Sequence, residues 1–248
     1  MSATPLANFD PLQAMYGAPY LYSDLCMVYP ATLGAIAQVG VEEFYRLLQH
    51  ITIHPPAISK ELKDVSAYKF LLAQSADVNF MKTTRQAISF FLKEDCLLMA
   101  EANVFALAGA PGDEKFQTIT EEQLSDIQDI IRQQHWLDPV KAKSGKAESS
   151  KAQEILDKLA RGKQQVSQLK GGKGGEDSTT LADIVGSMAV AIPGLNMLNI
   201  WDLTYYAFYD QFQRYQQKDA HDTNLRSALA GAKVSKDKLK SWIRPIQK

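Results

Sequence analysis

Apolar residues recur every three or four positions along much of this chain, which is the spacing of an amphipathic helix. The pattern is clearest at residues 41–51 and 80–92. Another helix is expected over residues 30–39, because Pro30 suits a first helical turn and Gly40 suits a helix end. The first part of the chain is therefore predicted to be largely helical.

Two pairs of short apolar runs flank polar turns and predict β-hairpins. The first pair lies at residues 20–29, and the second lies at residues 96–108, where Asn103 suits the turn. Residues 116–119 are expected to add a third strand to the second hairpin. Strands and helices are thus mixed in the first 137 residues.

Two later helices are predicted from capping boxes, in which a Thr at the N-cap and the residue three positions later bind each other's backbone N–H groups. Thr120 forms one such pair with Gln123, and Thr180 forms another with Asp183. Pro193 follows the second helix, so we interpret the apolar stretch 181–201 as helix, turn and helix rather than as a membrane span.

The densest aromatic segment of the chain is residues 199–217. On one helix, five of its rings would fall within an arc of about 80°. These residues are Trp201, Tyr205, Phe208, Phe212 and Tyr215. Such a row commonly faces a core, but the residues after 178 include few other large apolar side chains to cover it. We therefore predict a partner-binding surface, with packing on the chain's own first domain as the alternative. The pair His221-Asp222 is expected to end this helix.

Charge is unevenly distributed along the chain. The formal net charge is −1, which favours neither nucleic acid nor an anionic membrane. Residues 141–173 are the exception, with eight Lys and one Arg against three acidic residues, a net charge of +6. Together with the glycines at 171–175, this composition predicts a flexible Lys/Gly-rich linker over residues 138–178. A nucleic-acid-binding arm is less favoured, because the segment lacks aromatic residues for base stacking.

These patterns divide the chain into three parts. Residues 1–137 are predicted to form an α+β N-terminal domain with short β-hairpins, residues 138–178 the linker, and residues 179–248 an all-helical C-terminal module. The predicted class is therefore α+β and mostly helical.

Candidate metal ligands and reactive thiols lack the expected patterns. His50 and His54 have the spacing of a zinc-protease helix, but no Glu follows His50, and Pro55 ends the helix. Cys26 and Cys96 are seventy positions apart, which fits buried reduced thiols rather than a zinc or disulfide framework. We expect no metal site.

Catalytic constellations are also missing from the sequence. The acidic pairs at 42–43 and 121–122 belong to first helical turns, where carboxylates stabilise the helix dipole. The glycines around Lys173 lack the Ser or Thr of a phosphate-binding loop. We expect no catalytic residue, no cofactor and no enzymatic activity.

Three blocks, at residues 15–48, 118–139 and 196–232, resemble proteins of tailed phages and prophages of the tail-assembly-chaperone type. Two signatures in the last block carry the resemblance, an aromatic "WDLT-Y-F" run and an "N-R-A-AGA" segment. Their residues are Trp201, Asp202, Leu203, Thr204, Tyr205 and Phe208, followed by Asn224, Ala228, Ala230, Gly231 and Ala232.

The resemblance implies a protein that binds the long helical tape-measure protein, or another tail protein, and keeps it soluble during tail assembly. Helix-in-groove contacts would suit such a partner. The host cytoplasm is the expected location, since the first 45 residues have no Lys or Arg to begin a secretory signal. The virion tail is the alternative location.

Two other functions stay open: a structural component of the tail or its junctions, and a nucleic-acid-binding accessory protein. We expect no small-molecule substrate and no membrane partner, and we leave self-association into a homo-oligomer open.

Overall fold

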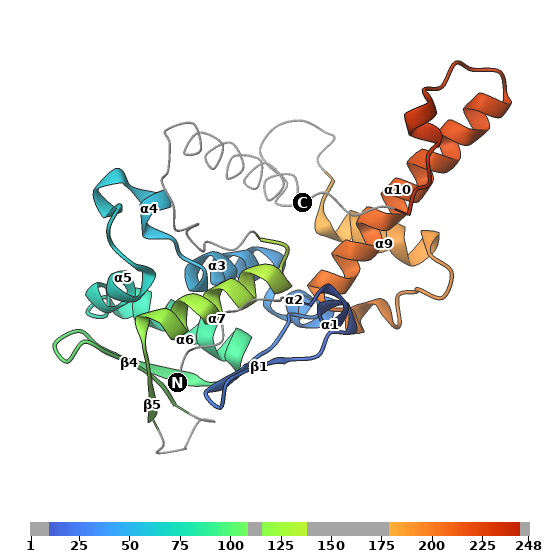
Figure 1. The fold of residues 1–248 in the computed structure, drawn as a ribbon. Helices are drawn as coiled ribbons and strands as arrows, with labels where there is room; N and C mark the ends of the chain where they lie inside the picture. Colours follow the sequence, from blue (N-terminus) through green and yellow to red (C-terminus); the bar gives the residue numbers. More distant parts are fainter. Residues whose placement is uncertain (1–9, 109–115, 138–178, 244–248) are drawn as a thin grey trace.

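The computed structural model describes residues 10–108, 116–137 and 179–243 (Figure 1). Within these ranges helices predominate, two small antiparallel sheets lie in the first part, and the C-terminal part is helical. The predicted α+β class is confirmed. The linker predicted at residues 138–178 lies outside the described residues, and the three-part division stays a prediction.

The described chain begins with a short helix that the sequence pattern did not predict. In α1 (Pro11–Tyr16), Asp10 is the N-cap and Gly17 closes the helix at φ 80°. The predicted first hairpin follows, with β1 (Tyr20–Tyr22) antiparallel to β2 (Cys26–Val28).

Two helices follow the hairpin, and the first of them starts later than expected. The N-cap of α2 (Leu33–Val39) is Thr32, whose hydroxyl accepts a hydrogen bond from the Ala35 N–H at 3.1 Å. Pro30 therefore precedes the helix, because the side-chain cap sets its start. As predicted, α3 (Val41–Ile51) begins directly after Gly40.

Four further helical segments lead to the second sheet. They are α4 (Pro55–Ile58), η1 (Lys60–Leu62), α5 (Ala67–Ala73) and α6 (Val78–Leu92). Pro55 occupies the first turn of α4, where its missing N–H costs no hydrogen bond.

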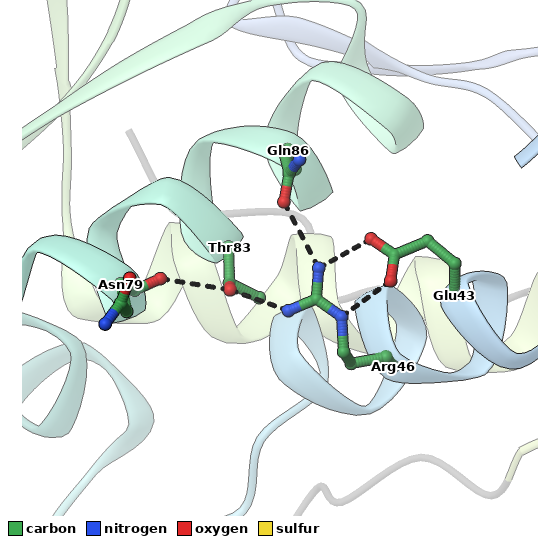
Figure 2. A network of polar contacts seen from close by, with 5 residues as sticks. All are labelled: Glu43, Arg46, Asn79, Thr83 and Gln86. Carbon is green, nitrogen blue, oxygen red and sulfur yellow. Dashed lines mark hydrogen bonds and ion pairs between the residues drawn. The ribbon is translucent and has the colours of Figure 1, made fainter.

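A polar clip joins α3 to α6 on the surface (Figure 2). The Arg46 guanidinium binds Glu43 on its own helix through two N–H groups, at 2.7 and 2.5 Å. It also donates to Thr83 at 2.7 Å and to Gln86 at 3.2 Å, while the Thr83 hydroxyl donates to the Asn79 carbonyl. All these bonds are exposed, so we interpret the clip as fixing helix orientation rather than as a chemical site.

The second sheet and the helix that follows it match the sequence pattern. The strands run in the antiparallel order β3 (Asp95–Met99), β4 (Val104–Ala108) and β5 (Phe116–Ile119), and the predicted turn residue Asn103 has φ 50°. The predicted capping box opens α7 (Glu121–Gln134).

The C-terminal part contains α9 (Leu181–Ala191), η2 (Ile200–Asp202), α10 (Tyr205–Leu229) and η3 (Lys236–Leu239). The capping box of α9 is confirmed. The aromatic helix differs from the prediction, since it starts at Tyr205 rather than residue 199 and continues through His221 and Asp222. Neither residue ends a helix here, because Asp222 binds Lys218 at i−4 and no Gly or Pro occurs before Gly231.

One hydrophobic core unites the two ends of the described chain. Its buried residues come from the first hairpin, from α2, α3, α5, α6 and α7, from the second sheet, and from α9, η2 and the start of α10. The C-terminal segment therefore uses the N-terminal part as its second layer. Among the described residues, no helix combines the length and apolar character needed to cross a membrane.

Candidate protein-docking surface

The start of α10 is fixed by backbone pairing with the N-terminal part. Thr204 forms an isolated antiparallel bridge with Thr32. On either side of it, the Leu33 N–H donates to the Leu203 carbonyl at 2.9 Å, and the Tyr205 N–H donates to the Ala31 carbonyl at 2.7 Å. This pairing holds Thr204 extended, and its hydroxyl caps the helix. A helix cannot pass through an extended residue, so residues 199–203 lie outside α10.

The first turn of α10 is buried in the shared core. Tyr205 is 5% exposed and Phe208 is fully buried. The Tyr205 ring packs against Phe44 and His135, with ring centroids 5.7 and 5.9 Å apart. Its hydroxyl lies 3.5 Å from the Tyr45 hydroxyl. These rings meet the chain's own first part, which was the alternative kept open from the sequence.

His135 is a neutral imidazole at the centre of this junction. Its Nε2 accepts a hydrogen bond from the Ala31 N–H at 3.3 Å, and its Nδ1–H donates to the Ile131 carbonyl at 2.6 Å. Complete burial lowers the pKa of His135 to about 4. The ring is thus a structural link, with both nitrogens occupied.

A second aromatic contact holds the first turns of α10. Trp136 stacks on Tyr206 with centroids 5.3 Å apart, packs against Tyr209 at the same distance, and donates its Nε1–H to the Tyr206 carbonyl at 3.2 Å. One turn later, the buried carboxylate of Asp210 accepts from Arg214 at 2.7 Å. Most aromatic rings of this segment therefore pack against other residues of the same chain.

The five predicted partner-binding residues do not form one stripe. Trp201 lies in η2, is half-buried, and donates its indole N–H to the Met197 carbonyl at 2.8 Å. Phe212 is half-buried, and Tyr215 is 36% exposed. Trp201 and Tyr215 therefore offer surface in this conformation, and Tyr205 and Phe208 do not. Partner binding by these residues stays a prediction.

An exposed apolar turn beside Trp201 was missed from the sequence. Val190 and Leu198 are each 89% exposed, and Met197 is 51% exposed. The turn is rigidly built, because the Asn199 side chain accepts from the Asn196 N–H and donates to the Gly194 carbonyl, both at 2.8 Å. We call Met197 and Leu198, together with Val190 near the end of α9, the apolar turn. Its one sequence signal, which is local and not periodic, is the pair Met197-Leu198 between the turn-forming Asn196 and Asn199.

Phe212 is the last hydrophobic residue of α10 that packs against the core. The distal part of the helix projects outward from the body, and the chain then folds back beside it (Figure 1). We call residues 213–243 the arm. It carries seven Lys and Arg against three Asp, a net charge of +4, whereas the other described residues carry eight basic and seventeen acidic side chains, a net charge of −9. A basic arm thus extends from an acidic body.

The histidine and cysteine side chains considered from the sequence are held by packing and hydrogen bonds within the fold. His50 binds the Thr84 hydroxyl at 2.8 Å and packs on Phe80, and burial lowers its pKa to about 4. Burial also raises the pKa of each thiol, Cys26 and Cys96, to about 12, which keeps both protonated and unreactive. Within the described residues, no group of three His, Cys, Asp or Glu side chains has the arrangement of a metal site.

A cleft of about 430 Å³ lies between α7 and the segment from α4 to α5. Arg132 lines it, and burial lowers the pKa of its guanidinium to about 10. The guanidinium donates to the Thr52 carbonyl at the end of α3, which is a helix-capping role. The cleft mixes Lys63 and Arg132 with Asp64, Glu121 and Asp129, so it has no consistent charge for an ionic ligand.

The comparison with protein families adds one finding. A family model described as the YomV second domain matches residues 173–247, under a third of the chain. The match spans α9, η2, α10 and η3, and it therefore includes both the apolar turn and the arm. YomV is a protein of the SPBc2 prophage, so the match supports a phage or prophage origin. No curated protein and no solved structure matches the chain.

Proposed function

We propose that this chain is a non-enzymatic phage protein that acts as a chaperone or adaptor in tail assembly and binds the helical tape-measure protein. The observation that carries the proposal is the concentration of exposed apolar side chains in the segment that matches the YomV second domain. The resemblance to tail-assembly chaperones supports the finer assignment. The proposed location is the host cytoplasm.

The apolar turn is the proposed docking surface. Met197 and Leu198 are presented on a turn fixed by side-chain hydrogen bonds, and Val190 precedes them near the end of α9. The Trp201 indole N–H is bonded to the Met197 carbonyl. An exposed apolar patch on a rigid support loses little conformational entropy on binding. A long tape-measure helix has apolar stripes that such a patch can cover, with the indole as an anchor.

Capture of tape-measure fragments by the tagged full-length chain tests this proposal. We expect Leu198→Asp to weaken capture by about tenfold or more, because a carboxylate would be desolvated in the contact. Val78→Asp is the matched control, since Val78 is 81% exposed on α6, far along the chain from the apolar turn. Equal capture by wild type and Leu198→Asp would contradict the proposed surface.

Mass spectrometry of purified particles separates the chaperone from its alternative, a structural tail component. A chaperone is expected to be scarce or absent in finished particles. Stoichiometric copies in the virion would overturn the chaperone assignment.

A further inference from the structure

The projecting part of α10 carries a regular row of side chains that the described body does not cover. Its positions are spaced 3, 4, 3 and 4 residues apart, which is the a/d repeat of a helix-pairing seam. At 100° per residue they fall within an arc of about 80°. We call this row the seam: Tyr215, Lys218, Asp222, Leu225 and Leu229.

The seam is exposed while a neighbouring face of the arm is partly covered. Tyr215, Leu225 and Leu229 are 36%, 42% and 80% exposed. The returning segment with η3 packs against α10, and most half-buried residues of the distal helix lie off the seam, at Gln217, His221, Asn224, Ser227 and Ala228. Within the seam, the Asp222 side chain is 33% exposed. Two leucines are thus exposed to solvent at adjacent seam positions. Apolar residues in such a row on a helix normally pack against a partner.

We propose that the seam pairs with the seam of a second copy of this chain, as an antiparallel helix pair about a two-fold axis. In that register, Lys218 of each copy faces Asp222 of the other. The same register places Tyr215 opposite Leu225 of the second copy. It also places Leu229 opposite Gln211, the half-buried residue four positions before Tyr215. Every a position thus meets a d position, as antiparallel pairing requires.

Charge selects this partner and this orientation. Lys218 and Asp222 already pair within one helix at 2.6 Å, with side chains 54% and 33% exposed, and the Asp222 carboxylate also lies 3.5 Å from the His221 ring. In the dimer, the Lys218 and Asp222 side chains turn to the opposite copy. A parallel pair would place Lys218 against Lys218 and Asp222 against Asp222, which is repulsive. The antiparallel pair also brings opposite net charges together. Each arm, with a net charge of +4, runs toward the described body of the other copy, which has a net charge of −9.

The length of the seam sets the expected affinity of the dimer. Residues 215–229 span about 21 Å of helix, or two heptads, and such short seams give weak pairs. The dimer is therefore expected at micromolar concentration and low salt, and screening is expected to weaken it as salt rises.

The first test is the mass of the full-length chain in solution. Analytical ultracentrifugation at tens of micromolar and low salt is expected to give twice the 27.6 kDa of one chain. Leu225→Asp combined with Leu229→Asp should give a monomer with an unchanged helical signal. Val78→Asp, at an 81% exposed position on α6 outside both the seam and the apolar turn, is the matched control and should remain a dimer. A wild-type chain that stays monomeric under these conditions would overturn the proposal.

The second test uses charge reversal and does not depend on the apolar residues. Lys218→Asp alone and Asp222→Lys alone each place like charges opposite each other and should be monomeric. Mixed in equal amounts, the two variants should form a heterodimer, because each Asp then faces a Lys. If the mixture stays monomeric while wild type dimerises, the seam is not the interface. Tape-measure capture plays no part in either readout, so this inference and the proposed function fail separately.

Discussion

At the scale of single residues, the junction between the two ends of the chain depends on His135 and the rings around it. The imidazole accepts from Ala31, donates to Ile131 and touches Phe44, Phe91 and Tyr205. A protonated ring could not accept the Ala31 hydrogen bond and would place a charge among aromatic side chains. The neutral state of this one ring is therefore tied to the docking of α10.

This link predicts an acid-sensitive stability. The native pKa of His135 is about 4, while an unfolded imidazole titrates near 6.5, so the unfolded chain binds more protons between these values. Stability is retained above pH 6.5 and lost as the pH falls toward 4. We expect the free energy of unfolding to fall by about 3 kcal/mol more in wild type than in His135→Gln over this interval. Urea denaturation at several pH values measures this free energy. If it fell equally with pH in the two proteins, the proposed role of the neutral His135 ring would be contradicted.

Phe208 and Tyr215 lie on the same helix, but Phe208 is buried and Tyr215 is exposed. Phe208 is fully buried, so Phe208→Ala should lower the free energy of unfolding by about 3–5 kcal/mol through lost packing and a cavity. Tyr215→Ala, at a position 36% exposed, should cost less than about 1 kcal/mol. Chemical denaturation of both variants checks this. A cost for Phe208→Ala as small as that for Tyr215→Ala would show that the ring is not part of the core.

At the scale of elements, α10 has two halves with different roles. Its first turns are buried by the N-terminal part and begin where Thr204 is bridged to Thr32, whereas its distal turns project from the body. The bridge and the cap together define where the aromatic helix starts. The docked half thereby positions the arm and the apolar turn relative to the body.

The helix start can be tested at Thr204. Its hydroxyl accepts the Ala207 N–H at 3.2 Å, so Thr204→Ala should reduce stability by about 1–2 kcal/mol. Thr223→Ala is the matched control, because Thr223 is an exposed position inside the same helix, where Ala is the better helix former. Thermal unfolding compares the two, and an equal or smaller loss in Thr204→Ala would contradict the capping role.

At the scale of the whole molecule, local signals predicted the elements better than their assembly. The capping boxes at Thr120 and Thr180 and the hairpin turn at Asn103 depend on neighbours in sequence, and the structure places them as predicted. The start of α10 depends on backbone pairing with residues about 170 positions earlier, which no local pattern contains.

The candidate site was predictable only in part, for the same reason. Helical periodicity places Tyr205 and Phe208 on one face of a helix, but it gives no information on which residues cover that face. The apolar turn went unnoticed because exposed apolar residues in a turn lack any periodic signal. The seam was hidden because His221-Asp222 was interpreted as a helix end, which would have divided it.

The most direct test of the account is hydrogen exchange of the full-length chain with and without a tape-measure fragment. We expect the fragment to slow exchange at residues 190–201, around the apolar turn, while amides 205–208 stay protected in both states because they lie in the core. A loss of protection at 205–208 on binding, with no change at 190–201, would contradict the account by showing that the aromatic residues leave the core to meet the partner.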